Sequence, residues 1–211
     1  MSLRLGDEAP DFQVNTTNGS ISFHEWIGDG WAVLMSHPAD FTPVCTTELG
    51  RVASIEHEFT NRNTKIIAVS VDPIDSHKKW IDDINDTQKT NLGFPLIADP
   101  EGEIAKLYDM IHPNADNKTT VRTLFVIGPD KKIKLSFTYP PSTGRNFTEV
   151  LRVLDSLQLT SSFQVSTPVD WKSGEDCVIP PTVAVEDIPV KYPKGYTEVR
   201  PYLRFTPQPN L

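Results

Sequence analysis

Short apolar runs alternate with segments of helical periodicity up to about residue 163. The strand-like runs lie at residues 31–35, 65–71, 94–98 and 123–127. The last run is followed by the turn sequence Gly128-Pro129-Asp130 and by an alternating apolar segment at 133–137. A turn between two such runs predicts a β-hairpin.

Two segments carry apolar residues at the helical spacing of about 3.6 residues. A capping-box pattern, Asn146-x-x-Glu149, opens the second segment. The apolar positions are Cys45, Leu49, Val52, Ile55 and Phe59 in the first segment, and Phe147, Val150, Leu151, Leu154 and Leu157 in the second. Strand–helix–strand units that end in a hairpin and a helix predict an α/β fold, with a mixed central β-sheet flanked by helices.

The pattern changes after residue 163. Eight of the 18 prolines lie in residues 166–211, and no long periodic segment occurs there. We therefore expect a first domain over residues 1–163 and a proline-rich C-terminal extension over 164–211. This extension is either a small appended domain or an extended arm that lies on a partner.

Composition and charge narrow the function classes. The 211 residues include 20 Lys and Arg against 28 Asp and Glu, a net charge of −8. Such a surface argues against non-specific binding to nucleic acid or to anionic membranes. There is no apolar run of about 18 residues, and the first eight residues lack the apolar segment of a signal peptide. We expect a cytoplasmic protein with no nucleic-acid partner and no stable membrane association.

The segment between the first strand-like run and the first helix carries the candidate chemistry. Thr42 is a favourable N-cap and Pro43 suits the first helical position. Cys45 then falls in the first turn, where the helix dipole favours negative charge. The pKa of a thiol at such a site can fall from about 8.5 to roughly 3.5–7.5. Position alone leaves two interpretations of Cys45 open, a small core residue or a thiolate nucleophile; a thioredoxin-type dithiol is excluded, because no second cysteine lies three residues away.

A family resemblance favours the interpretation of Cys45 as a thiolate nucleophile. The pattern Pro38-x-x-x-Thr42-x-x-Cys45 resembles the signature of the peroxiredoxin family, and residues 36–51 are similar to its 1-Cys group. Further similar segments lie at 6–12, 94–97, 128–132, 139–147, 167–171 and 202–209. The resemblance implies a thioredoxin-like fold and a thiol-dependent peroxidase that reduces hydrogen peroxide and organic hydroperoxides, in antioxidant defence and redox homeostasis.

The resemblance also implies a role for each matched residue. The Cys45 thiolate would attack the peroxide and become a sulfenic acid, which an external thiol, glutathione or the thioredoxin system, would reduce. Thr42 and Arg122 would complete the catalytic set. Thr42 would donate to the thiolate or accept from the incoming hydroperoxide, and Arg122 would stabilise both the thiolate and the departing oxygen. The pocket and supporting positions are Pro38, His37, Glu48 and Arg145.

Two departures from related proteins refine this prediction. Thr167 stands where two-cysteine peroxiredoxins carry a resolving cysteine, and Cys177 is interpreted as an incidental thiol. Gly30 stands where a serine would be needed for the phospholipase activity assigned to some members, although His24 and Asp130 match its supposed partners. Without that hydroxyl we expect no serine-type lipase.

The remaining expectations concern cofactors and partners. The five histidines show no metal-ligand spacing, so we expect neither a metal nor an organic cofactor. The resemblance implies a homodimer formed through sheet edges, for which the alternating segment 132–139 is a plausible edge strand. A rival from another class is a non-enzymatic redox sensor or holdase, which would react with peroxide only once.

Overall fold

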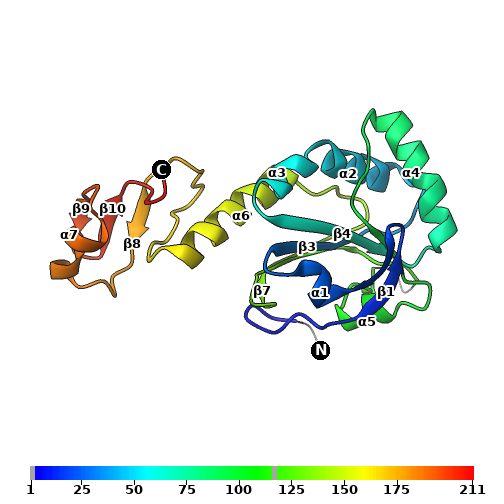
Figure 1. Ribbon diagram of the computed structural model, residues 1–211, viewed down its shortest axis with the longest axis horizontal. Helices are drawn as coiled ribbons and strands as arrows, with labels where there is room; N and C mark the ends of the chain where they lie inside the picture. Colours follow the sequence, from blue (N-terminus) through cyan, green and yellow to red (C-terminus); the bar gives the residue numbers. More distant parts are fainter. Residues whose placement is uncertain (1–2, 116–117) are drawn as a thin grey trace. The chain divides into compact units, whose positions relative to one another are not determined.

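The computed structural model describes residues 3–115 and 118–211, in two compact units, Met1–Phe147 and Thr148–Leu211. The sequence composition changes near residue 163, whereas the contacts divide the chain after Phe147. The difference arises because α6 (Phe147–Ser162) has the periodic apolar pattern of the first unit but groups with the C-terminal unit. Figure 1 shows both units along the chain.

A seven-stranded mixed sheet forms the centre of the first unit, in the order β2-β1-β5-β4-β3-β6-β7. Strands β3, β4 and β5 are parallel, whereas β1, β6 and β7 pair antiparallel with their neighbours. The bounds are β1 Gln13–Thr16, β2 Gly19–Ser22, β3 Trp31–Ser36, β4 Thr64–Ser70, β5 Leu96–Ala98, β6 Arg122–Ile127 and β7 Ile133–Tyr139. The mixed sheet and the β6–β7 hairpin are confirmed; the β1–β2 hairpin is additional.

Helices cover both faces of this sheet. Figure 1 shows α2 (Pro43–Ser54), α3 (Glu56–Thr60) and α4 (Ile74–Gln88) on one face, and α1 (Phe23–Ile27) and α5 (Glu103–Leu107) on the other. The continuous helical face predicted for residues 45–59 is interrupted at Ile55. There the backbone leaves the helical region, with φ −118° and ψ 16°, while the side chain remains buried.

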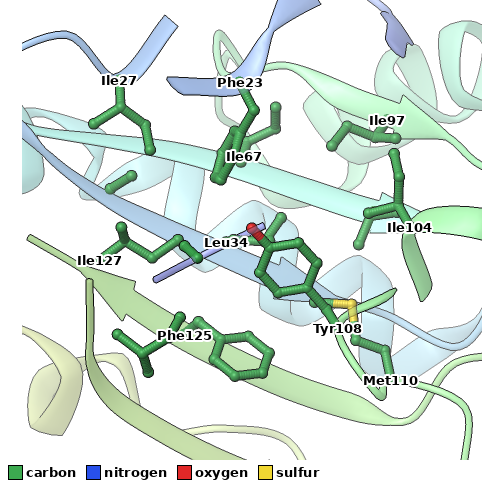
Figure 2. Packing of buried hydrophobic residues seen from close by; sticks show 14 of the residues in the cluster. Phe23, Ile27, Leu34, Ile67, Ile97, Ile104, Tyr108, Met110, Phe125 and Ile127 are labelled. Carbon is green, nitrogen blue, oxygen red and sulfur yellow. The ribbon is translucent and has the colours of Figure 1, made fainter. Parts of the chain in front are cut away.

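One hydrophobic cluster joins α1 and α5 to the sheet. Figure 2 shows Phe23 of α1 and Ile104 of α5 facing Leu34, Ile67 and other strand residues. The rings of Tyr108 and Phe125 pack edge to face, with their centroids 5.4 Å apart, and add to the cluster. This packing fixes β3 and β6, the two strands whose ends lead to the candidate site.

The C-terminal unit is folded and is not an extended arm. It contains a three-stranded antiparallel sheet in the order β8-β10-β9, formed by β8 (Cys177–Ile179), β9 (Thr197–Arg200) and β10 (Leu203–Thr206). Two short helical segments, η1 (Val185–Asp187) and α7 (Ile188–Lys191), lie between β8 and β9. Strands of three or four residues are too short to produce the periodicity that sequence patterns reveal.

This second unit has its own core, which contains Leu159, Val165, Trp171, Cys177, Ile179, Val183, Ile188 and Tyr192. Across the described parts of both units, no helix is both long enough and apolar enough to span a bilayer.

Candidate active site

Cys45 is the third residue of α2 and is fully buried. The helix begins as predicted, with Thr42 in an extended conformation before it and Pro43 at its first position. The predicted side-chain cap is wrong, however, because the Thr42 hydroxyl donates to the carbonyl oxygen of Ala39 at 2.8 Å. The lone pairs of the Thr42 oxygen therefore remain acceptors for another group.

Arg122 contacts the Cys45 sulfur from the start of β6. Its Nη1 lies 3.4 Å from Cys45 Sγ, and the arginine is only 2% exposed. Nε and Nη2 both donate to the carbonyl oxygen of Pro141, at 3.0 and 2.7 Å. The guanidinium is thus held in one orientation, with its positive charge beside the sulfur.

Glu48 lies one helical turn after Cys45 and binds two buried arginines. Its Oε2 accepts from Arg122 Nη1 at 2.7 Å and from Arg145 Nη2 at 2.8 Å. Its Oε1 accepts from the backbone N–H and the Nε of Arg145, at 2.7 and 2.9 Å. Burial alone would raise the pKa of Glu48, but the contacts with Arg145, followed by Arg122, hold this pKa below its ordinary value. Glu48 therefore remains ionised.

The buried charges around the sulfur do not balance without Cys45. Two guanidinium groups and one carboxylate lie in a region where the three residues are at most 7% exposed, leaving one net positive charge. An excess buried charge is unfavourable unless a counter-charge is near. A thiolate at Cys45 would supply that negative charge.

The other predicted site residues lie in the segment that leads into α2. Pro38 and His37 are both buried. The Nε2 of His37 lies 3.1 Å from Asp40 Oδ1, and its ring packs on Trp80 with the centroids 5.2 Å apart. The structure thus groups Cys45, Glu48, Arg122 and Arg145 in direct contact, while Pro38, His37 and Thr42 belong to the loop before them.

The sequence patterns did not place two side chains of this region, Asp40 and His77, near the site. The histidine spacings along the chain indicated no cluster, yet ligand-type atoms of His37, Asp40 and His77 lie within 4.8 Å of one another. His77 is forty residues from His37, and only the adjacency of β3 and β4 brings them together. The Pro141 carbonyl that orients Arg122 was also missed, because a backbone acceptor leaves no sequence signal.

The residues that match a lipase motif do not form a catalytic set. His24 Nε2 contacts the carbonyl oxygen of Ala9 at 2.7 Å, and Asp130 pairs with Lys134 at 2.6 Å. A Cβ atom at Gly30 would lie 2.9 Å from the backbone oxygen of Asn63, so a serine there requires a backbone shift.

Cys177 differs from Cys45 in its surroundings. It is fully buried in the core of the C-terminal unit. Burial, together with the nearby Asp176 carboxylate, raises the pKa of the Cys177 thiol. The neutral form is thus favoured, which makes Cys177 a weak nucleophile at neutral pH.

Two family models match this chain. The model of the AhpC/TSA family matches residues 5–136, and that of the C-terminal domain of 1-Cys peroxiredoxin matches residues 156–195. Among curated proteins, a 1-Cys peroxiredoxin of Dictyostelium discoideum is 52% identical over 208 residues, which cover 99% of this chain and 86% of that protein. Peroxiredoxin-6 of Mus musculus is 51% identical over 220 residues, 98% of each chain.

Similar solved structures are also peroxiredoxins of this kind. The yeast mitochondrial 1-Cys peroxiredoxin, studied for thiol resolution via glutathione/thioredoxin systems, superposes with a TM-score of 0.92 at 48% identity, covering 97% of this chain and 99% of its own. A cysteine-to-serine mutant of peroxiredoxin 6 from Arenicola marina has a TM-score of 0.92 at 43% identity, with 100% of both chains covered.

The Glu48 network generates a stability prediction. Glu48→Gln should lower the free energy of unfolding at pH 7 by about 3–5 kcal/mol, because it leaves two buried guanidinium groups without their carboxylate. Urea denaturation measures the difference. Glu58→Gln, which breaks the more exposed pair with Arg62, is the control and should cost no more than about 1 kcal/mol.

The stability difference between wild type and Glu48→Gln should also depend on pH. The pKa of Glu48 is lower in the folded chain than in the unfolded one, so its stabilisation is complete above the unfolded value of about 4.3. The stabilisation is lost as the pH falls from there towards the folded pKa. The difference between wild type and Glu48→Gln should therefore shrink below about pH 4.3; a Glu48→Gln protein as stable as Glu58→Gln at pH 7 would contradict the network's importance.

Proposed function

The chain belongs to the AhpC/TSA family, in its 1-Cys peroxiredoxin group, and we propose on this premise that Cys45, Arg122 and Thr42 carry its peroxidase reaction. It has the thioredoxin-like α/β fold and is a thiol-dependent peroxidase that uses a single cysteine. The observation that supports Cys45 as this cysteine is the Arg122 guanidinium beside its sulfur, in a buried group of Arg122, Arg145 and Glu48 that carries one net positive charge.

In the first half-reaction, the Cys45 thiolate attacks the terminal oxygen of a hydroperoxide. The S–O bond forms as the O–O bond breaks, giving a sulfenic acid and an alkoxide (hydroxide from hydrogen peroxide) that takes up a proton. Four of the five Arg122 N–H groups are directed at Pro141, Glu48 and Cys45 among the described residues. The fifth, on Nη2, can stabilise the negative charge as it moves from sulfur to the departing oxygen.

Thr42 has the complementary role of acceptor. Its hydroxyl proton is directed to the Ala39 carbonyl, so its oxygen can accept the hydroperoxide O–H. A peroxide bound between Thr42 and Arg122 would present its terminal oxygen to Cys45. Such orientation converts an encounter into a reactive geometry.

In the second half-reaction, an external thiol condenses with the sulfenic acid, releasing water and forming a mixed disulfide. A second thiol then restores Cys45. An external reductant fits a chain with Thr167 at the resolving position and a weakly nucleophilic Cys177. We assign this role to glutathione, with the thioredoxin system as the alternative, by analogy with the yeast relative.

Assembly and location complete the proposal. β7 occupies one end of the sheet order, and its outer edge fits twofold pairing with β7 of a second copy. We therefore propose a homodimer. Two unpaired cysteines fit the reducing cytoplasm, where we place the protein.

Cys45→Ser should abolish peroxide consumption, because a hydroxyl is a poor nucleophile at neutral pH. Steady-state turnover with glutathione as reductant measures this. Cys177→Ser is the matched control and should retain wild-type activity. Turnover in Cys45→Ser would refute the assignment. A single stoichiometric reaction of the wild type with peroxide would indicate a redox sensor. A quantitative Cys45–Cys177 disulfide would indicate a two-cysteine enzyme.

Thr42→Val and Arg122→Met should each lower the second-order rate constant for Cys45 oxidation by about two orders of magnitude or more, because each removes an oriented group from the transition state. Stopped-flow measurement with hydrogen peroxide gives the rate. Thr42→Ser retains the hydroxyl and should remain within a few-fold of wild type. A wild-type rate in Thr42→Val or Arg122→Met would remove that residue from the mechanism.

Phospholipid vesicles should not be hydrolysed by the wild type, since Gly30 offers no nucleophile. Gly30→Ser should not create this activity, because the new side chain meets the Asn63 backbone and His24 and Asp130 have other partners. Release of fatty acid is the measurement. Hydrolysis by the wild type that disappears in His24→Ala would contradict this prediction.

A further inference from the structure

A buried cluster of three ionisable side chains lies behind the loop that precedes α2. His37 and Asp40 come from this loop, directly after β3, and His77 comes from the first turn of α4. Asp40 Oδ1 lies 3.1 Å from His37 Nε2, and Asp40 Oδ2 lies 2.8 Å from His77 Nδ1. The three side chains are at most 2% exposed.

The acceptors that face the two ring nitrogens of His77 indicate the charge of its ring. Its Nε2 lies 3.0 Å from the carbonyl oxygen of Ile97, which can only accept. Its Nδ1 faces the Asp40 carboxylate, which when ionised also only accepts. Both ring nitrogens must then carry hydrogen, so His77 is an imidazolium.

The neighbouring groups are consistent with this charge. Burial would raise the pKa of Asp40, but the hydrogen bonds from His37 and His77 outweigh it and hold this pKa well below the ordinary value. Burial lowers the pKa of His37, which therefore donates from Nε2 as a neutral ring. Asp72, after β4, is the further acidic group that faces the cluster, and it accepts the Asp40 backbone N–H at 3.0 Å.

These contacts hold a loop in a conformation that it would not adopt alone. Phe41, between Asp40 and Thr42, has φ 53°, in the left-handed region that residues other than glycine rarely occupy. Such strain persists where surrounding contacts determine the backbone. Asp40 provides those contacts on one side of Phe41, through its carboxylate and its N–H, and Thr42 provides one on the other side through Ala39.

We propose that Asp40 and His77 are positioning residues of the peroxidase: their buried ion pair fixes the loop at 37–42 and so sets where Thr42 meets the peroxide. The proposal rests on the proposed function of Cys45. Without the pair, Phe41 can relax towards ordinary φ values, which displaces Thr42 relative to the Cys45 sulfur.

Asp40→Asn and His77→Gln test this. Each should slow oxidation of Cys45 by hydrogen peroxide by about 10- to 100-fold, because a displacement of about 1 Å can cost about 100-fold. The double variant should be no slower than the slower single variant, since both changes remove one interaction. Asp99→Asn is the matched control: it alters another buried carboxylate, which accepts the backbone N–H groups of Glu103 and Ala105, and should leave the rate unchanged.

Nitrogen-detected NMR of the imidazole rings gives a readout that does not depend on activity. In the wild type at pH 7, His77 should show the doubly protonated signature and His37 the neutral ring protonated at Nε2. In Asp40→Asn, His77 should become neutral. A neutral His77 in the wild type would overturn the proposal, even if a variant failed to fold.

The remaining outcomes separate the alternatives. Wild-type rates in Asp40→Asn and His77→Gln would overturn the positioning role while leaving Cys45 in place, whereas absence of Cys45 sulfenic acid in the wild type would instead refute the proposed function. Two histidines and a carboxylate are also zinc ligands. A stoichiometric metal in protein purified without added metal, with oxidation of Cys45 slowed by chelation, would overturn the ion pair.

Discussion

Glu48 forms ion pairs with two buried arginines, and the rest of the site depends on these two interactions. A carboxylate that is 3% exposed is stable there only because Arg122 and Arg145 surround it, and the arginines are stable only because Glu48 stands between them. Two positive charges and one negative charge leave a deficit, which the Cys45 thiolate fills in the mechanism we propose. In that mechanism, the same electrostatic arrangement accounts for both the order of the site and the reactivity of its sulfur.

This network joins parts of the chain that lie far apart in sequence. Glu48 and Cys45 share one face of α2, being three residues apart. Arg122 comes from the start of β6, and Arg145 from the segment after β7, where its Nη1 also donates to the carbonyl oxygen of Thr123. Since β6 pairs directly with β3, which leads into α2, the sheet register determines the distance between guanidinium and sulfur.

The sequence predicted the parts of this structure that repeat or carry a side-chain signal. Continuous apolar runs revealed β3 and β4, and the position of Cys45 within the first turn of α2 followed from Thr42 and Pro43. Choosing Arg122 among the arginines required the family resemblance, because a buried arginine and an exposed one look alike in sequence. The Asp40–His77 pair and the Pro141 acceptor could not be predicted, since they depend on tertiary proximity and on backbone atoms. The C-terminal sheet could not be predicted from the sequence because its strands are too short to show a period.

We propose that the charge cluster makes Cys45 the reactive thiolate. Anaerobic titration of the reduced protein with hydrogen peroxide, followed by mass spectrometry of both cysteine peptides, tests this directly. One equivalent of peroxide should add one oxygen to Cys45 and none to Cys177, and excess peroxide should oxidise Cys45 further to the sulfinic or sulfonic acid. Oxidation that begins at Cys177, or a Cys45 that stays reduced, would contradict it.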